Sequence, residues 1–164
     1  MGIMKKITIF LVLLLLAGFS YAQQISFQIV QHDISADYVT EQTYMIEDQL
    51  VDMFFENGYI VTNSPTVYAE RESDDEKFWN DGLRDAYDGY SDYFVQIKLY
   101  YTMERKTNKG GATLKKADWV LVYAPTAQEI VKSTVKSKES KDLSDDVFFM
   151  SSDIFNAIKK AIKA

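Results

Sequence analysis

The chain has 164 residues, of which 47% are apolar and 26% charged, and its formal net charge is −6. Seven glycines and two prolines are too few for a collagen-like or low-complexity chain, and the apolar content is too high for a disordered one. There is no cysteine and only one histidine. These counts exclude a thiolate nucleophile, a disulfide framework, a thiolate metal site and a two-histidine zinc site.

The first 22 residues have the pattern of a secretory signal. Lys5 and Lys6 precede a nearly unbroken apolar run at residues 7–16, and residues 20–22 (Ser-Tyr-Ala) place small side chains three and one positions before a cut. The run is about ten residues long, short of the roughly 18 that a membrane-spanning helix needs. We therefore expect cleavage after Ala22 and a single globular domain over residues 23–164, in a periplasm or secreted, with no membrane span.

The first half of this domain predicts two strands around a long helix. Residues 25–31 alternate apolar and polar side chains, as a half-buried strand does. Residues 35–57 carry apolar side chains at helical spacing, and Gly58 follows as a stop. Residues 59–62 begin a second strand, which Pro65 ends or confines to an edge because proline has no amide hydrogen.

A short helix and two strands are expected next. Residues 73–76 (Ser-Asp-Asp-Glu) form a capping box with Ser73 as the cap, and Gly89 is placed to end the helix. Residues 93–104 alternate strictly and are the clearest strand in the sequence. A turn at residues 108–111 leads to residues 119–124, which are apolar on both faces and so predict a central strand.

The chain is expected to close with a strand and a helix. Residues 129–138 alternate, with lysines on the exposed side, and Ser144 is placed to cap a final helix. The whole order is β-α-β-α-β-β-β-α. It predicts an α/β (α+β) domain with a five-stranded mixed sheet, because the opening crossover is parallel and the later hairpins are antiparallel, with the helices packed on the sheet.

Several local sequences carry a resemblance to a known family. They are residues 54–61 (FFENGYIV), Trp79 ahead of residues 91–97 (SDYFVQI), and residues 119–123 (WVLVY) turning into residues 129–131 (EIV). In this order they resemble the amino-terminal domain of TolB, a layout shared with penicillin-binding-protein activators and the curli secretion lipoprotein. The chain lacks the propeller, the lipid-attachment cysteine and the tether of those relatives. The resemblance implies a non-enzymatic envelope module that binds another protein of the envelope.

Catalytic and metal-binding signatures are few. His32 and Asp33 are adjacent, so on a strand they point to opposite sides, and we expect His32 to be a solvated strand-end residue. No G-x-S-x-G or S-x-x-K motif occurs. The acidic stretch 70–92 does not follow calcium-loop spacing, although adventitious cation binding there stays open. We predict no catalytic residue, no cofactor and no structural metal.

An alternative site lies beside Trp79. Two carboxylates flanking a cleft with sugar-stacking aromatic rings would resemble a glycosidase pair, although aromatic residues at helical spacing more often pack in a core. The alternative reading is therefore a small exported enzyme or ligand-binding protein whose site comprises Trp79, Asp81, Asp85, Tyr87 and Asp88.

Charge is distributed unevenly along the domain. Residues 23–69 contain seven acids and no lysine or arginine, whereas residues 98–141 contain ten bases and four acids. Two surfaces of opposite sign can steer association with a protein partner, and nucleic acid is not expected for an exported chain. Lysines on an edge strand also discourage aggregation, and both roles stay open. The predicted partner surface comprises Lys98, Tyr100, Lys132, Thr134, Lys136 and Lys138.

Overall fold

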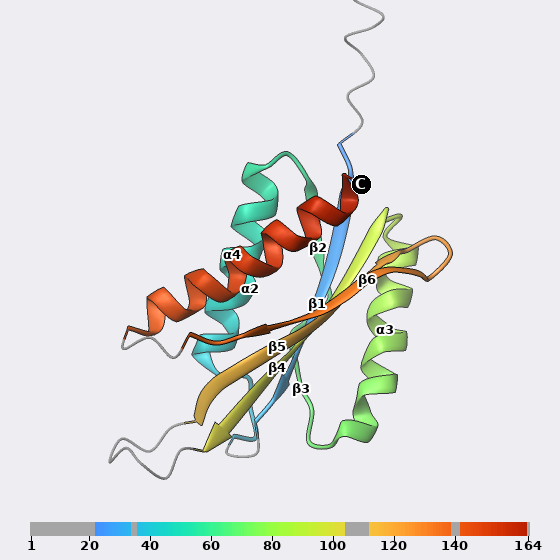
Figure 1. The fold of residues 1–164 in the computed structure, drawn as a ribbon. Coiled ribbons are helices and arrows are strands. Elements are labelled where there is room, and N and C mark those ends of the chain that lie inside the picture. Colours follow the sequence, from blue (N-terminus) through green and yellow to red (C-terminus); the bar gives the residue numbers. More distant parts are fainter. Residues whose placement is uncertain (1–21, 34–35, 104–111, 139–141, 164) are drawn as a thin grey trace, which may run out of the picture.

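The computed structural model describes residues 22–33, 36–103, 112–138 and 142–163. Within them, strands and helices alternate and then give way to a run of three strands (Figure 1). In chain order the elements are β1 (Gln24–His32), α2 (Glu41–Glu56), β2 (Ile60–Asn63), β3 (Val67–Tyr68), a 3₁₀ turn (Glu72–Asp74), α3 (Asp75–Asp88), β4 (Tyr93–Met103), β5 (Ala112–Tyr123), β6 (Gln128–Lys136) and α4 (Leu143–Ile162).

The strands form one mixed, open sheet. Its order is β2-β1-β4-β5-β6, and the two-residue β3 pairs with β1 beyond the end of β2. Strand β1 runs parallel to β2, β3 and β4, while the β4–β5 and β5–β6 pairs are antiparallel. The mixed sheet expected from the sequence is confirmed, with the short β3 as an addition to the five expected strands.

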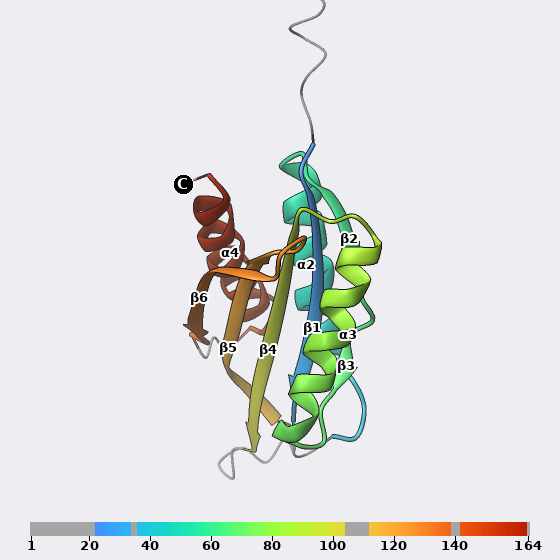
Figure 2. The same ribbon diagram turned by 90° about the vertical axis from the view of Figure 1, so that its right-hand side faces the viewer.

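The helices cover the two faces of the sheet unequally. Helices α2 and α4 lie together on one face, and α3 lies alone on the other, over β1 and β4 (Figure 2). The main core fills the space under α2 and α4, and its members include Phe27, Leu50, Val95, Leu121 and Ile154. A smaller core under α3 comprises Ala86, Phe94, Val122 and Ala124. Because α3 covers only its own half, the β5–β6 half of that face lies open.

Long alternating segments were predicted well. The strand expected at residues 93–104 is β4, and β5 has a neighbour on each side, as expected of a central strand. Gly89 caps the end of α3, and the chain turns tightly after Tyr123 into β6. Ser35, Glu104 and the turn expected at 108–111 lie outside the described residues.

Three helix starts differ from the prediction. Helix α2 begins at Glu41, not Ser35, because Thr40 is held in extended geometry at its amino end. Ser73 does not cap α3: a 3₁₀ turn precedes the helix, and Asp74 accepts the backbone N–H of Arg71 at 3.2 Å.

The third misplaced start is that of α4. Its cap is Asp142, whose Oδ1 accepts the Ser144 N–H at 2.9 Å, so the expected Ser144 cap is wrong. Ser144 is instead the second residue of the helix. Both residue types are good caps, and the carboxylate two residues earlier takes the role.

Candidate functional site

Strand register arranges the side chains on the α3 side of β4, β5 and β6 into three rows. Residues at even positions of β4 point to the α3 face, and the pairing of β5 and β6 continues each row. We call the surface formed by these nine residues the open face, and Gln96 at its inner edge is itself buried. The rows are Gln96-Val120-Lys132, Lys98-Asp118-Thr134 and Tyr100-Lys116-Lys136.

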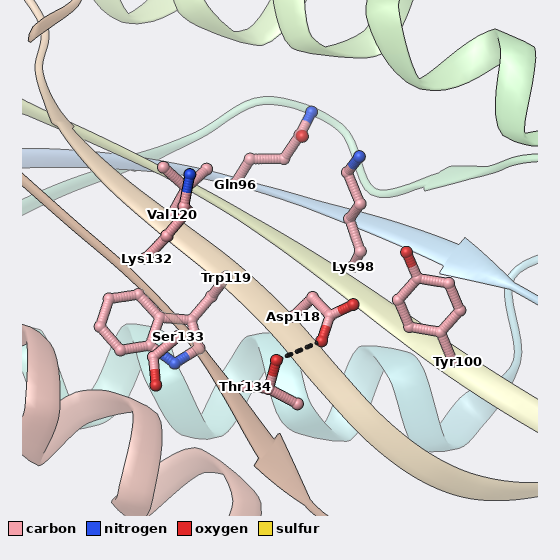
Figure 3. A pocket seen from close by; sticks show the side chains of 9 residues that line it. All are labelled: Gln96, Lys98, Tyr100, Asp118, Trp119, Val120, Lys132, Ser133 and Thr134. Atoms are coloured by element: carbon pink, nitrogen blue, oxygen red, sulfur yellow. Dashed lines mark hydrogen bonds between the residues drawn. The ribbon is translucent and has the colours of Figure 1, made fainter. Parts of the chain in front are cut away.

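A groove of about 490 Å³ runs over the open face (Figure 3). It takes in four residues of the predicted partner surface, Lys98, Tyr100, Lys132 and Thr134. Lys136 extends the third row and is exposed. Lys138 lies apart from these five, because it follows the end of β6 and its Nζ sits 3.8 Å from the centre of the Phe149 ring on α4.

The groove is bordered by a carboxylate from α3. Asp75, at the start of that helix, accepts a hydrogen bond from Lys98 Nζ at 2.5 Å, with the two side chains only 16% and 27% exposed. Its other oxygen lies 3.0 Å from His32 Nε2, at ion-pair distance but without hydrogen-bond alignment. Lys98 is therefore held in place by a partly desolvated charge.

His32 does not lie in solvent as the sequence suggested. Its side chain is 11% exposed, and its ring stacks on that of Tyr100 with 4.8 Å between the ring centres. The expectation is wrong because Asp75, at the amino end of α3, folds over the end of β1. Burial, and then the charges of Asp118, Asp75 and Glu72, raise the pKa of the Tyr100 phenol.

A second carboxylate lies in the middle of the open face. Asp118 accepts hydrogen bonds from Lys116 Nζ at 2.6 Å and from Thr134 Oγ1 at 2.7 Å. Burial acts to raise the pKa of Asp118, but these two hydrogen bonds and the charges of Lys116 and Lys98 outweigh it and hold the pKa below its ordinary value. Asp118 thus stays ionised at neutral pH and pins Lys116 to the sheet.

We expect Asp118→Asn to reduce stability at pH 7 and to reduce it less at about pH 3. A carboxyl group with a lowered pKa in the folded state stabilises the protein above its unfolded pKa, and this contribution is lost as the pH falls through the folded value. Urea unfolding at both pH values tests this, with the exposed Asp153→Asn as control. An equal stability gap at both pH values would contradict it.

The aromatic residues of the alternative site do not share a cleft. Trp79 packs on Phe94 under α3, with 5.4 Å between the ring centres, and so contributes to the smaller core. Tyr87 is exposed and borders a different open groove, lined by Asn80, Leu83, Arg84 and residues 124–127. That groove has no carboxylate in its lining.

The acidic residues near Trp79 have separate partners. Asp81 pairs with Arg84 at 2.9 Å, and Asp85 accepts from Ser64 Oγ at 3.0 Å. Asp92 accepts the backbone N–H of Gln24 at 2.8 Å. In the part of the chain that the structure describes, no three histidine, aspartate or glutamate side chains gather as a metal site would require. The absence of a metal stays a prediction.

Comparison with known proteins places the chain in a family. A family model described as "Uncharacterised protein" matches residues 24–163. The chain belongs to this family. No curated protein matches the chain in sequence.

Several solved structures are similar to the chain. A PelC L103M dodecamer from Paraburkholderia phytofirmans is 11% identical, with a TM-score of 0.53, over 81% of this chain and 86% of that chain. Lipoprotein GNA1162 from Neisseria meningitidis is 14% identical, with a TM-score of 0.48, over 84% and 99%. TolB from Acinetobacter baumannii is 13% identical, with a TM-score of 0.43, over 87% and 29%.

These identities establish a likeness of fold alone. The PelC likeness, with a TM-score of 0.53, shows a shared fold, and the expected resemblance to TolB amino-terminal-domain-like proteins concerns the fold alone. Among the residues of this chain that the structure describes, no helix has the length and apolar character needed to cross a membrane.

Lys116, Asp118 and Asp75 belong to the candidate site but were not predicted from the sequence. Lys116 and Asp118 could have been predicted, because they fall at alternate positions with Val120 and so extend the predicted central strand toward its amino end. Asp75 had no such signal, since it reaches the groove from a helix 23 residues away in sequence from Lys98.

Proposed function

We propose that this protein is a non-enzymatic, exported binding module of the cell envelope that docks a partner protein on its open face. The observation that carries the proposal is the half-covered sheet. Helices α2 and α4 lie together on one face, whereas the other face has one helix and an open groove beside it (Figure 2). Protein partners commonly occupy such surfaces, and the lysine rim favours an acidic one.

The fixed polar groups of the open face support this role. Lys98 and Lys116 are each held by a carboxylate, so their positions are set before any partner arrives. Lys132 and Lys136 stand at the edge on β6 and are exposed. A preorganised centre with cations at its rim suits recognition, because less side-chain freedom is lost on binding.

The residue types favour binding over catalysis. The single histidine is enclosed by Asp75 and Tyr100 rather than poised beside a hydroxyl nucleophile. The groove on the open face is shallow and shared among three strands, without a pair of facing carboxylates in its lining. These features support assigning the groove to a macromolecular partner.

Export is the second part of the proposal. The carbonyl of Gln23 accepts the N–H of Ile60 at 3.0 Å, and β1 begins at Gln24. A cut after Ala22 would therefore leave every strand of the sheet in the mature protein. We place the mature chain in the periplasm or outside the cell, beginning at Gln23.

The fold also occurs in a protein that assembles. PelC, which shares the fold, is described as a dodecamer. That assembly supports the view that this scaffold can present surfaces for other protein chains.

We expect the double variant Lys132→Glu, Lys136→Glu to capture less of its partner from an envelope extract than the wild type. Both side chains are exposed, so the stability should change by less than about 0.5 kcal/mol for each. The capture should weaken because an acidic partner would meet reversed charge. Quantitative mass spectrometry of proteins retained by the immobilised mature chain gives the readout.

The matched control is Lys160→Glu, Lys163→Glu. It makes the same change in net charge near the end of α4, on the opposite side of the sheet from the open face. Recovery of the same partners by wild type and by both double variants, at low and moderate salt, would refute docking on the open face.

A further inference from the structure

We propose that the open face of one copy binds helix α2 of a second copy, so that copies join head to tail. This rests on the proposed function and names the partner segment. The contact would bring the acidic surface expected in the first part of the chain onto the lysines of the second part.

Helix α2 presents an acidic outer surface. Four exposed carboxylates follow its length at helical spacing: Glu41, Asp48, Asp52 and Glu56. No lysine or arginine occurs anywhere in residues 23–69. The nearby base Lys159 of α4 is engaged, since its Nζ donates to Asn57 Oδ1 at 2.5 Å. Among the described residues, none of these four carboxylates is in an ion pair, so α2 presents a largely anionic surface.

The open face offers the complementary charge. Lys132 is 73% exposed and has only a loose contact with Glu129 at 3.4 Å. Lys136 is also exposed, and no ion pair joins it to another of the described residues. Two cations at the β6 edge therefore face solvent, while Lys98 and Lys116 are already paired with Asp75 and Asp118.

The dimensions of the two surfaces agree. Neighbouring strands lie about 4.8 Å apart, so β4 to β6 span about 10 Å, close to the 10–12 Å width of one helix. Lys132 and Lys136 are four residues apart on a strand, about 13 Å. Asp48 and Glu56 are eight residues apart on a helix, about 12 Å. Helix α2 of a second copy, placed beside α3, would therefore cover the open face, just as α2 and α4 lie side by side on the opposite face.

Exposed aromatic side chains on α2 add an apolar component. Phe55 is 71% exposed, and Tyr44 is also exposed on the same side of the helix as the carboxylates. The groove offers apolar surface at Val120 and at the Tyr100 ring. Burial of such aromatic residues in grooves contributes much of the binding energy at protein interfaces.

The placement of the two surfaces decides the kind of assembly. Helix α2 and the open face lie on opposite sides of the sheet (Figure 2). A chain therefore cannot place its own α2 on its own open face, and two copies cannot exchange the contact symmetrically. Repeated use of such a contact gives a ring if it closes and a filament if it does not.

Light scattering coupled to size-exclusion chromatography of the purified mature chain tests the contact. We expect the wild type to assemble at low salt and to dissociate as salt rises. Lys132→Glu, Lys136→Glu should weaken self-association about tenfold or more, and so should Asp48→Lys, Asp52→Lys, since each sets like charges against each other. Mixing the two variants should restore assembly. The acidic open face of the first variant then meets the basic α2 of the second, and the unchanged open face of the second meets the unchanged α2 of the first.

The control is again Lys160→Glu, Lys163→Glu, which should assemble like the wild type. Circular dichroism and urea unfolding establish that each variant is folded. A wild type that is monomeric at low salt and high concentration would overturn the inference, as would folded variants that stay monomeric when mixed. Capture of another envelope protein by a monomeric wild type would contradict self-association but leave the proposed function standing. A monomeric wild type that also captures no envelope protein would contradict both proposals.

Discussion

Gln31→Leu is expected to lower the free energy of unfolding by about 3–5 kcal/mol, because it leaves several buried polar groups without a partner. Gln31 is fully buried at the end of β1. Its Oε1 accepts the Thr40 N–H at 2.8 Å and the Thr43 hydroxyl at 2.6 Å, and its Nε2 donates to the Tyr38 carbonyl at 3.0 Å. One amide thus ties the approach to α2 to the sheet and sets where that helix begins.

Urea unfolding followed by circular dichroism measures the effect. Tyr101→Phe is a graded comparison, since it removes the 2.8 Å bond between the Tyr101 and Thr43 hydroxyls and should cost about 1 kcal/mol. Gln128→Leu, at the exposed start of β6, should change stability by less than about 0.5 kcal/mol. A loss below that of Tyr101→Phe would show that the buried amide does not organise this end of the sheet.

Strict alternation made the strands readable from sequence. In β4, Val95, Ile97 and Leu99 are fully buried against α2 and α4, as their spacing predicts. The opposite side was harder to read. Gln96 belongs to the polar side of the alternation, yet it is buried, and its Nε2 donates to Gln28 Oε1 at 3.0 Å. Periodicity separates two faces, but it does not say which parts of the polar face a helix will cover.

The candidate site was predictable in part. Alternation alone placed Lys98 and Tyr100 on one side of β4 and Lys132, Thr134 and Lys136 on one side of β6, and the register then brings them together across β5. The carboxylates that fix the lysines come from other elements and depend on tertiary packing. Nothing local in the sequence distinguishes Asp75, which borders the groove, from Asp74, which bonds to the backbone of Arg71.

Helix caps show a similar limit at shorter range. Ser73 and Ser144 each have the right residue type, yet neither caps its helix: Asp142 caps α4, and Asp74 precedes α3 without a side-chain cap hydrogen bond. Serine and aspartate cap with similar free energy, so the choice depends on how the preceding chain enters the helix. That entry is set by packing against the sheet, which the local sequence does not specify.

Gly82→Ala is expected to destabilise the protein by about 1–3 kcal/mol even though it replaces glycine within a helix. Alanine is favoured over glycine there by about 1 kcal/mol when the position is free. In α3, however, an added Cβ would lie 2.8 Å from Gln28 Oε1 and 2.8 Å from Phe94 Cζ. Both neighbours are buried, and Gln28 is hydrogen-bonded to Gln96, so either these packed side chains or the helix must shift.

Asn80→Ala on the same helix separates packing from helix propensity. Asn80 is exposed, so alanine there should raise stability by a few tenths of a kcal/mol, opposite in sign to Gly82→Ala. Outward movement of α3 would also draw Asp75 from Lys98 and His32, and so loosen the border of the groove. Crystal structures or chemical shifts of the Gly82→Ala protein should therefore show changes at the open face. A stabilised Gly82→Ala protein with an unchanged open face would mean that α3 is not held by close contact at Gly82.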